Sequence, residues 1–293
     1  MVENVEELLT RFEEHLVRSA LAPTTIVNYL ADLRTFARWH ADVRGTASSL
    51  LGLMPDDIRE YRRHMQTNEG WSPATINRRL QAVRKFYSFA METGRTESNP
   101  ASRVRLIPRP GPDPPRALDP QEVTSLLAAV QGGRPSLVKR DYAIVQLLLQ
   151  TGIKLGELTR LCLADVQLRA NGVGSLLVGG GNPRGGDDSK YRRIPLSPMA
   201  CSALRDYLRV RPPSASTENL FLSQEGSCIS KRTVQRLIRV YTQAAGLEDV
   251  SAHILRHTFA VSTLANTGDI SLVSRLLGHR CMETTAKYLI SDI

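Results

Sequence analysis

The sequence contains no uncharged apolar run approaching the roughly 18 residues that a membrane-spanning helix requires. It also does not open with the charged stretch and short apolar core of a secretory signal. These absences exclude the patterns typical of membrane-inserted and exported proteins. We therefore expect a cytosolic, cytoplasmic protein with no membrane partner.

Cysteine is scarce and scattered. The four cysteines, Cys162, Cys201, Cys228 and Cys281, form no Cys-x-x-Cys pair in a chain of 293 residues. Neither a disulfide framework nor a cysteine-based zinc site is indicated. We expect reduced thiols that mostly fill core space.

Acidic residues are outnumbered by basic ones. The 29 Asp and Glu residues stand against 38 Lys and Arg residues, which gives a formal net charge of +9. An anionic polymer such as nucleic acid is a natural partner for this charge, although a solvated basic surface gives the same composition. The chain is long enough for two ordinary domains with real hydrophobic cores.

Helical periodicity dominates the first hundred residues. Apolar residues recur at helical spacing from Val5 to Val17, again after Pro23, and again after Ser72 and Pro73, a good N-cap and first-turn pair. The third helix carries basic residues opposite its apolar stripe. Such a face can be simply solvated, but its short polar groups suit phosphates and base edges. The predicted DNA contacts are Thr24, Thr25, Asn77, Arg78, Gln81, Arg84 and Lys85.

A proline-rich stretch divides the chain. Five prolines fall between Ala101 and Arg116 without any periodicity, which predicts an extended linker. We therefore expect a helical core DNA-binding domain at 1–103, a linker at 104–116 and a second domain at 117–293.

The second domain begins with a predicted capping box, in which Asp119 is the N-cap and Glu122 is its partner three residues later. Helices are expected at about 120–130 and 138–151. Two strand-like runs joined by a glycine-rich stretch predict a β-hairpin over 173–196, and helical patterns return after it.

Residues 253–257 read HILRH, a spacing that suits either a metal ion or a phosphate. A metalloprotease box would place a glutamate directly after the first histidine, where this chain has Ile254. Arg256 would also repel a divalent cation. An arginine and a histidine at i, i+3 share one helix face and donate several hydrogen bonds to an oxyanion, so phosphate is favoured.

HILRHTFA, followed by LLGHRCMETTAKYL, resembles the signature of the tyrosine recombinase (phage integrase) family. TGIKLGELTRL resembles the family's first box, and SPATINRRLQAVRKFYSFAMETGRTESNPA resembles its core-binding domain. The resemblance covers nearly the whole chain. It implies a mainly α-helical protein, with an N-terminal helical, SAM-like core-binding domain and a mostly helical catalytic domain that carries a small antiparallel β-sheet.

The resemblance implies a DNA strand transferase that needs no metal or cofactor. Tyr288 would attack a phosphodiester to form a 3′-phosphotyrosyl link and free a 5′-hydroxyl. Arg256 and His253 would bind the non-bridging oxygens, His279 would add a donor, and Glu157 would support the first box. Fixed cations suit this chemistry, because a phenol is a poor nucleophile near neutral pH and charge grows on the phosphate during attack.

The first box departs from the family pattern, because Lys154 stands where the family has its first catalytic arginine. Lysine keeps the charge but loses the planar two-pronged grip on phosphate. Losing one such donor costs roughly 2–4 kcal/mol, so we expect an attenuated catalyst. Either the protein tolerates lysine there, or the residue was changed from arginine to hold a DNA complex before cleavage; the other, intact boxes favour the second explanation.

Further departures lie in the hairpin and at the end. The family's hairpin lysine protonates the leaving 5′-oxygen, and Lys190 is the only lysine available for that role; a plain contact with backbone phosphate is the alternative. His257 is not one of the family's catalytic positions and is expected to pack structurally. Only LISDI follows Tyr288, so coupling between protomers is expected to be weaker than in relatives with longer tails.

The implied partner is duplex DNA carrying specific recombination sites, held by four protomers of this chain or of this chain and a related recombinase. Strand exchange would pass through a Holliday junction. The size suggests an Xer-like or small transposon-encoded recombinase. Two rivals remain open: a DNA-binding module of the same fold that does not cut, and a topoisomerase that uses the same phosphotyrosine.

Overall fold

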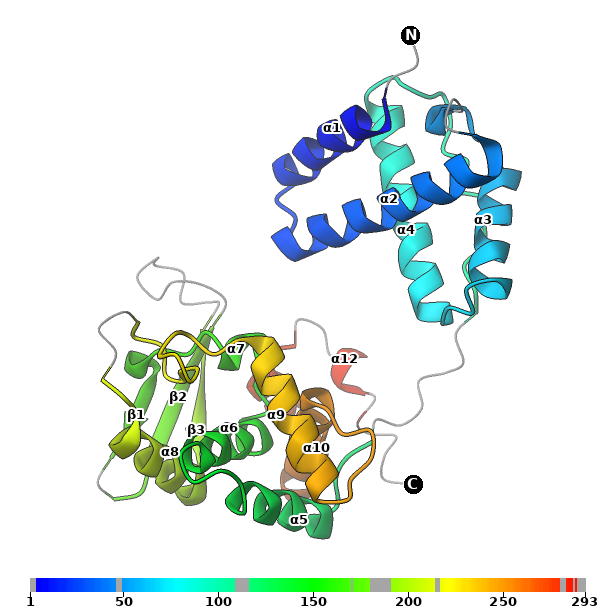
Figure 1. Ribbon diagram of the computed structural model, residues 1–293. Coiled ribbons are helices and arrows are strands. Elements are labelled where there is room, and N and C mark those ends of the chain that lie inside the picture. Colours follow the sequence, from blue (N-terminus) through cyan, green and yellow to red (C-terminus); the bar gives the residue numbers. More distant parts are fainter. Residues whose placement is uncertain are drawn as a thin grey trace. The chain divides into compact units, whose positions relative to one another are not determined.

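The computed structural model describes residues 4–45, 49–108, 116–169, 171–179, 191–213, 217–279, 283–286 and 288. The chain divides into two compact units, Met1–Gly111 and Pro112–Ile293, here named the N-terminal unit and the C-terminal unit (Figure 1). Each unit has its own hydrophobic core. The mainly helical fold with a small antiparallel sheet is confirmed.

The regular elements in the described part of the N-terminal unit are all helical. Its elements are α1 (Val5–Arg18), α2 (Pro23–Arg44), the 3-10 turn η1 (Leu50–Gly52), α3 (Pro55–Thr67) and α4 (Pro73–Glu92). The long helices α2 and α4 pack across each other (Figure 1). Ser72 caps α4 as predicted, because its side-chain oxygen accepts a hydrogen bond from the Thr75 amide. Helix α3 is not among the predicted helices, since its buried apolar residues are few and its sequence is mostly polar.

The segment after α4 folds back onto that helix. The side chain of Asn77 donates to the carbonyl oxygen of Ile107 and accepts from its amide, both at 2.8 Å. Arg84 donates to the carbonyl oxygens of Ala101 at 3.1 Å and Val104 at 2.5 Å. These contacts attach the first part of the predicted linker to the N-terminal unit.

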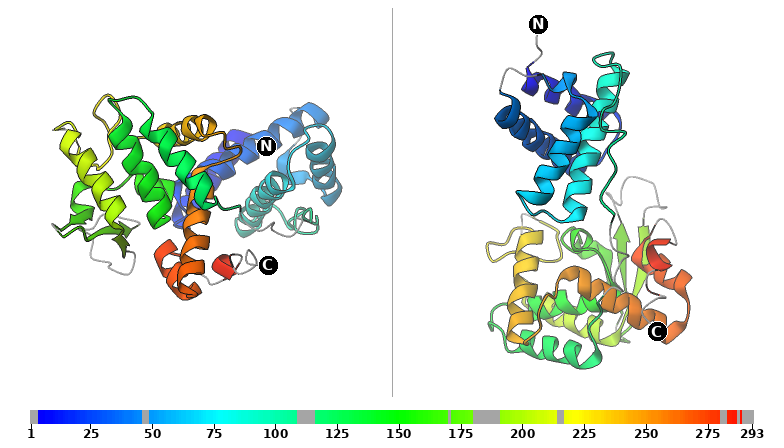
Figure 2. Two further views of the ribbon diagram at one scale, coloured as in Figure 1. Left: turned by 90° about the horizontal axis from the view of Figure 1, so that it is seen from below. Right: turned by 90° about the vertical axis from the view of Figure 1, so that its right-hand side faces the viewer.

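The C-terminal unit is a helical domain with one small sheet. Its helices are α5 (Pro120–Gln131), α6 (Val138–Thr151), α7 (Leu155–Leu158), η2 (Leu163–Asp165), α8 (Pro198–Val210), α9 (Lys231–Ala244), α10 (Ala252–Thr267), α11 (Ile270–Leu277) and α12 (Glu283–Ala286). The capping box at the start of α5 is confirmed: Asp119 accepts from the Glu122 amide, and the Glu122 carboxylate accepts from the Asp119 amide. Helix α12 lies beside α11 (Figure 2).

The sheet has three antiparallel strands in the order β1 (Val166–Leu168), β2 (Gly174–Gly179) and β3 (Tyr191–Leu196). Strands β2 and β3 form the predicted hairpin. The three-residue strand β1 is not among the predicted elements. The hairpin tip at 180–190 and the linker residues 109–115 lie outside the described residues.

Gly152 ends α6 in a left-handed conformation, with φ of 58°. A Cβ atom at this position would lie 2.3 Å from the ring of Phe259, so only glycine fits beneath α10. The chain therefore turns sharply where α6 meets α10. None of the helices in the described ranges is long and apolar enough to cross a membrane.

Candidate active site

A pocket of about 750 Å³ opens in the C-terminal unit where the α6–α7 turn meets α9 and α10. It brings together five predicted site residues from different parts of the C-terminal unit: Lys154, His253, Arg256, His279 and Tyr288. The other lining residues are Ile153, Leu155, Gln235, Arg239, Val250, Ser251, Ala252 and Thr284.

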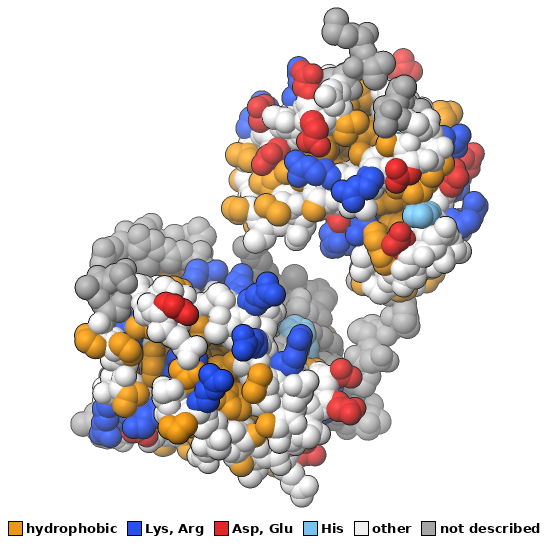
Figure 3. All heavy atoms as spheres, in the orientation of Figure 1, with side chains coloured by type: hydrophobic (Ala, Val, Ile, Leu, Met, Phe, Trp, Pro, Cys, Tyr) orange, Lys and Arg blue, Asp and Glu red, His pale blue; other side chains and the backbone are white. Residues whose placement is uncertain are grey.

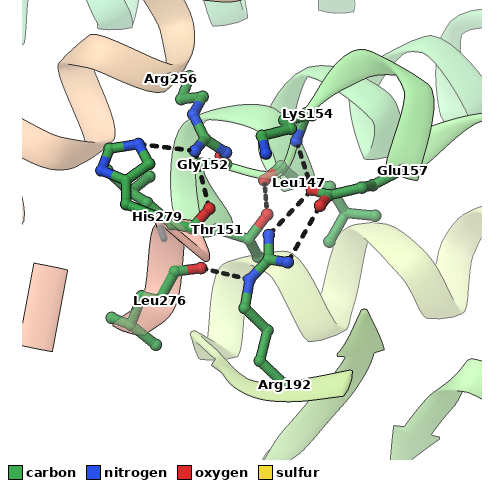
Figure 4. Close-up of polar contacts among 10 residues, drawn as sticks. Leu147, Thr151, Gly152, Lys154, Glu157, Arg192, Arg256, Leu276 and His279 are labelled. Atoms are coloured by element: carbon green, nitrogen blue, oxygen red, sulfur yellow. Dashed lines mark hydrogen bonds and ion pairs between the residues drawn. The ribbon is translucent and has the colours of Figure 1, made fainter. Parts of the chain in front are cut away.

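Arg256 is fixed on α10 by backbone carbonyls. Its guanidinium donates to the carbonyl oxygen of Gly152 at 2.5 Å and to that of Leu277 at 2.8 Å (Figure 4). The residue is only 5% exposed. Burial lowers the pKa of Arg256, yet an arginine side chain remains protonated at neutral pH. The pocket therefore holds a rigid, buried cation.

His279 lies against this cation and has a defined tautomer. Its Nε2 is 3.1 Å from an Arg256 nitrogen, and its Nδ1 is 2.8 Å from the Thr285 hydroxyl. Because a guanidinium can only donate, Nε2 accepts. The Nδ1 atom then carries the hydrogen and donates to Thr285, so this arrangement describes a neutral imidazole.

A partly buried ion pair supports the pocket. Arg192 on β3 makes two parallel hydrogen bonds to Glu157, at 3.0 and 2.9 Å, and donates to the carbonyl oxygen of Leu276 at 2.6 Å (Figure 4). Glu157 also accepts from the Lys154 amide at 2.7 Å. The sheet, α7 and the end of α11 are thereby joined directly beside Arg256.

The pKa of Glu157 shows how complete this pairing is. Burial alone would raise the pKa, but the hydrogen bonds and charge of Arg192, with the Lys154 amide, hold it below its usual value. The predicted support of the first box by Glu157 thus has a physical basis: the carboxylate fixes the backbone at Lys154. The Lys154 side chain itself is exposed and lines the pocket.

Tyr288 is 1% exposed and packs in a small apolar cluster between α10 and α11. Its hydroxyl lies 2.7 Å from Nδ1 of His257. Burial raises the pKa of the phenol, and the positive charge of Arg256 lowers it in part. The cluster consists of Phe259, Ala260, Leu264, Val273, Leu277 and Tyr288.

His257, which was expected to pack structurally, is buried and makes this hydrogen bond from α10. It is 5% exposed, and its ring also meets the ring of His253, with centroids 4.2 Å apart. The sequence spacing placed His257 beside Arg256 on α10, but not beside the tyrosine 31 residues further along. That contact depends on how α12 and the following residue fold back.

The predicted DNA contacts of the N-terminal unit have different surroundings. Asn77 is 5% exposed and its amide binds Ile107, while Arg84 holds the same returning segment. Arg78 donates to the buried carboxylate of Asp32. Gln81 and Thr24 are exposed, and Thr25 and Lys85 are half-buried. Their roles in DNA binding stay predictions.

Sequence reasoning missed the basic surface of α9. The exposed residues Lys231, Gln235 and Arg239 follow one stripe at i, i+4 and i+8, and the exposed Arg232 and Arg236 lie beside it. Figure 3 shows Lys and Arg side chains gathered over this part of the C-terminal unit. Gln235 and Arg239 also line the pocket. The same periodicity used for α4 could have found this face.

Lys190, the predicted leaving-group acid, lies outside the described residues. Among the residues that the structure does describe, no three His, Cys, Asp or Glu side chains gather as a metal ion would need.

Comparison with known proteins gives consistent results. The sequence model described as Phage integrase family matches residues 116–292, and that described as Phage integrase, N-terminal SAM-like domain matches residues 9–94. Tyrosine recombinase XerD of Lacticaseibacillus casei is 32% identical over 290 residues, covering 96% of this chain and 92% of the relative.

Two solved structures show the same fold. XerH site-specific recombinase bound to difH substrate in a pre-cleavage complex has a TM-score of 0.72 at 24% identity, over 90% of this chain and 75% of that one. A lambda integrase tetramer bound to a Holliday junction has a TM-score of 0.73 at 18% identity, over 98% and 77%.

Proposed function

The chain belongs to the phage integrase family and is a tyrosine-type site-specific DNA recombinase, and from this premise we propose that Tyr288 cleaves DNA through a 3′-phosphotyrosyl intermediate. One observation carries the proposal. Lys154, His253, Arg256 and His279 line the same pocket as Tyr288, although they come from separate segments of the chain. A nucleophile and several phosphate-binding groups are the parts that such a reaction requires.

Arg256 is the main phosphate ligand in this proposal. Its carbonyl contacts orient it before DNA arrives, so little reorganisation is needed as charge grows on the non-bridging oxygens. His253 and Lys154 add donors from the pocket wall. His279 accepts from Arg256 in the geometry seen here, so donating Nε2–H to a phosphate requires a second ring proton or the other tautomer.

Lys154 attenuates the enzyme in this proposal. Its ammonium supplies charge to the phosphate but not two parallel hydrogen bonds, which costs transition-state stabilisation of roughly 2–4 kcal/mol relative to arginine. Glu157 supports catalysis indirectly by fixing the Lys154 backbone. Lys190 protonates the 5′-oxygen that leaves, a role that rests on the family resemblance alone.

Both units bind the duplex in this proposal. The helical domain at 1–103 presents Thr24, Gln81 and Lys85, the linker spans 104–116, and the catalytic domain at 117–293 presents the exposed cations of α9. Four protomers, identical or shared with a related recombinase, pair two sites and exchange strands through a Holliday junction. A tetramer on such a junction is what the lambda integrase structure contains. The cytosolic location stays a prediction.

Covalent trapping tests the proposal. Wild-type protein, a Lys154→Arg variant and a Tyr288→Phe variant are incubated with fragmented genomic DNA of the source organism in EDTA, denatured in SDS, and the attached DNA is sequenced. We expect metal-independent adducts from wild type, about a hundredfold faster formation with Lys154→Arg, and none with Tyr288→Phe.

The rivals give different results. DNA binding without adducts from either tyrosine-containing protein would favour a module that does not cut. Adducts accompanied by relaxation of a supercoiled plasmid, without recombinant products from paired sites, would favour a topoisomerase. An unchanged rate in Lys154→Arg would contradict the attenuation.

A further inference from the structure

The hydrogen bond between Tyr288 and His257 links the nucleophile to a residue outside the family's catalytic set. The phenol hydroxyl and the imidazole Nδ1 are 2.7 Å apart, and the residues are 1% and 5% exposed. Their rings meet edge to face, with centroids 5.4 Å apart. We propose that His257 is a catalytic residue: its Nδ1 takes the proton that Tyr288 releases on attacking the phosphodiester. This inference rests on the proposed function.

The attacking phenol needs a proton acceptor at this position. Tyrosine has an ordinary pKa near 10, and burial raises the pKa of Tyr288 further, so the hydroxyl is protonated at neutral pH. Arg256 can stabilise negative charge, but a guanidinium has no lone pair that could accept a proton. A neutral imidazole at hydrogen-bond distance can accept one.

The hydrogen bonds of His279 and His257 give these two imidazoles different roles. His279 points Nε2 at Arg256 and Nδ1 at Thr285, so both ring nitrogens are engaged away from the phenol. His257 directs Nδ1 at the phenol oxygen, and in its neutral form that nitrogen accepts while Nε2 carries the hydrogen. His257 also lies within α10, next to Arg256, so phosphate ligand and proton acceptor share one rigid helix.

The step balances in atoms and charge. The O–H bond of Tyr288 breaks, a bond from its oxygen to phosphorus forms, and the bond from phosphorus to the 5′-oxygen breaks. The phenol proton moves to Nδ1 of His257, while the 5′-oxygen takes a proton from the general acid. Rejoining reverses both transfers: the 5′-hydroxyl returns its proton to that acid, and the His257 imidazolium returns its proton to the phenol.

Two substitutions separate proton transfer from simple support. His257→Asn places an amide oxygen near the position of Nδ1, so it can still accept a hydrogen bond and position the phenol, but it is far too weak a base to take the proton. His257→Phe removes the contact. Thr258→Val is the matched control, because Thr258 also makes buried hydrogen bonds on α10, to the Leu118 amide and the Ile254 carbonyl, both at 2.9 Å.

The reaction is followed on a duplex of the target sequence identified by covalent trapping. This duplex carries sulfur in place of the scissile 5′-oxygen. A thiolate leaves without protonation, so the rate reports on the attacking side. We expect single-turnover cleavage by His257→Asn to fall roughly 10²–10⁴-fold, with no rescue by sulfur. Thr258→Val should cleave like wild type, and sulfur should rescue Lys190→Ala.

Three outcomes would overturn the inference. Cleavage by His257→Asn at the wild-type rate would reduce His257 to a positioning residue, and faster cleavage by His257→Phe would make the contact a restraint on Tyr288. Both leave the proposed function intact, whereas wild-type protein without Tyr288-dependent adducts removes both proposals. Nitrogen NMR of the DNA-free protein decides independently of folding losses: Nδ1 of His257 should be unprotonated and should shift in Tyr288→Phe, and a hydrogen on Nδ1 excludes proton acceptance.

Discussion

Asp32 in the N-terminal unit and Glu157 in the C-terminal unit are both carboxylates paired with arginine, yet their pKa values shift in opposite directions. In the N-terminal unit, burial raises the pKa of Asp32 more than Arg78 and Arg79 lower it. In the C-terminal unit, the hydrogen bonds and charge of Arg192 outweigh burial and lower the pKa of Glu157.

The two carboxylates differ in the geometry of their hydrogen bonds. Glu157 receives two parallel bonds from Arg192 and a third from the Lys154 amide. Asp32 meets Arg78, whose side chain is 46% exposed, while Arg79 remains 3.7 Å away. At Glu157 two parallel bonds and a backbone amide together outweigh burial, whereas the contacts of Asp32 do not.

The largest loss of stability should come from breaking the ion pair between Glu157 and Arg192. Glu157→Gln leaves Arg192 buried without its counter-charge, and we expect a loss of about 3–5 kcal/mol in the unfolding free energy of the C-terminal unit. Urea unfolding monitored by hydrogen exchange in β3 measures it. The exposed Glu218→Gln control should change stability by less than about 0.5 kcal/mol. Equal losses in both variants would show that the pair contributes nothing special.

Lowering the pH should remove the stabilisation that ionised Glu157 contributes. Because the folded pKa of Glu157 lies below the ordinary value of 4.5, its stabilisation is fully present above that pH and disappears as pH falls through the folded pKa. The gap between wild type and Glu157→Gln should therefore close under acid. The folded pKa of Asp32 is raised instead, so ionised Asp32 contributes less stability. Asp32→Asn should therefore lower the unfolding free energy less than Glu157→Gln does at neutral pH. A gap that widens in acid would contradict the assignment.

A smaller loss should follow from freeing the segment after α4. Asn77→Ala leaves the amide and carbonyl of Ile107 without their partner, which should cost about 1–3 kcal/mol in the N-terminal unit. The exposed Asn28→Ala on α2 is the control and should be nearly neutral. Thermal unfolding of both variants measures the difference. Matching melting curves would mean that Asn77 is available for another role.

The smallest stability effect belongs to the exposed face of α4. Gln81→Ala should change the unfolding free energy by less than about 0.5 kcal/mol. Lys85→Ala should weaken DNA binding and reduce the slope of log affinity against log salt by about 1, as expected for one lost phosphate contact. Fluorescence titrations at several salt concentrations, on a duplex of the target sequence identified by covalent trapping, test this. An unchanged slope would remove Lys85 from the interface.

Local signals predicted much of the fold. Ser72 caps α4, the box of Asp119 and Glu122 starts α5, and the hairpin of β2 and β3 falls within the expected range. These features depend on neighbouring residues, so their sequence is sufficient. The elements that were missed include α3, α7 and β1. Helix α3 has local signals that could have found it, since Pro55 lies in its first turn and Ile58, Tyr61 and Met65 recur at helical spacing. Strand β1 has only three residues and depends on its pairing with β2.

The sequence predicted which residues form the site, but not which of them contact one another. The boxes identified Arg256, His279 and Tyr288, which the structure places around one pocket. The pairing of Arg192 with Glu157 spans 35 residues, and that of His257 with Tyr288 spans 31. Contacts at such separations depend on how distant elements pack, and the spacing of residues along one helix cannot reveal them.

The carbonyl partners of Arg256 have an electrostatic consequence. Gly152 caps the end of α6, and Leu277 is the last residue of α11, so both oxygens belong to helix C-termini, where the helix dipole is negative. Dipoles can hold a buried cation without carrying a net charge of their own. Arg256 is thus held mainly by dipoles, with the charge of Glu157 nearby, and remains a cation for the first phosphate that enters.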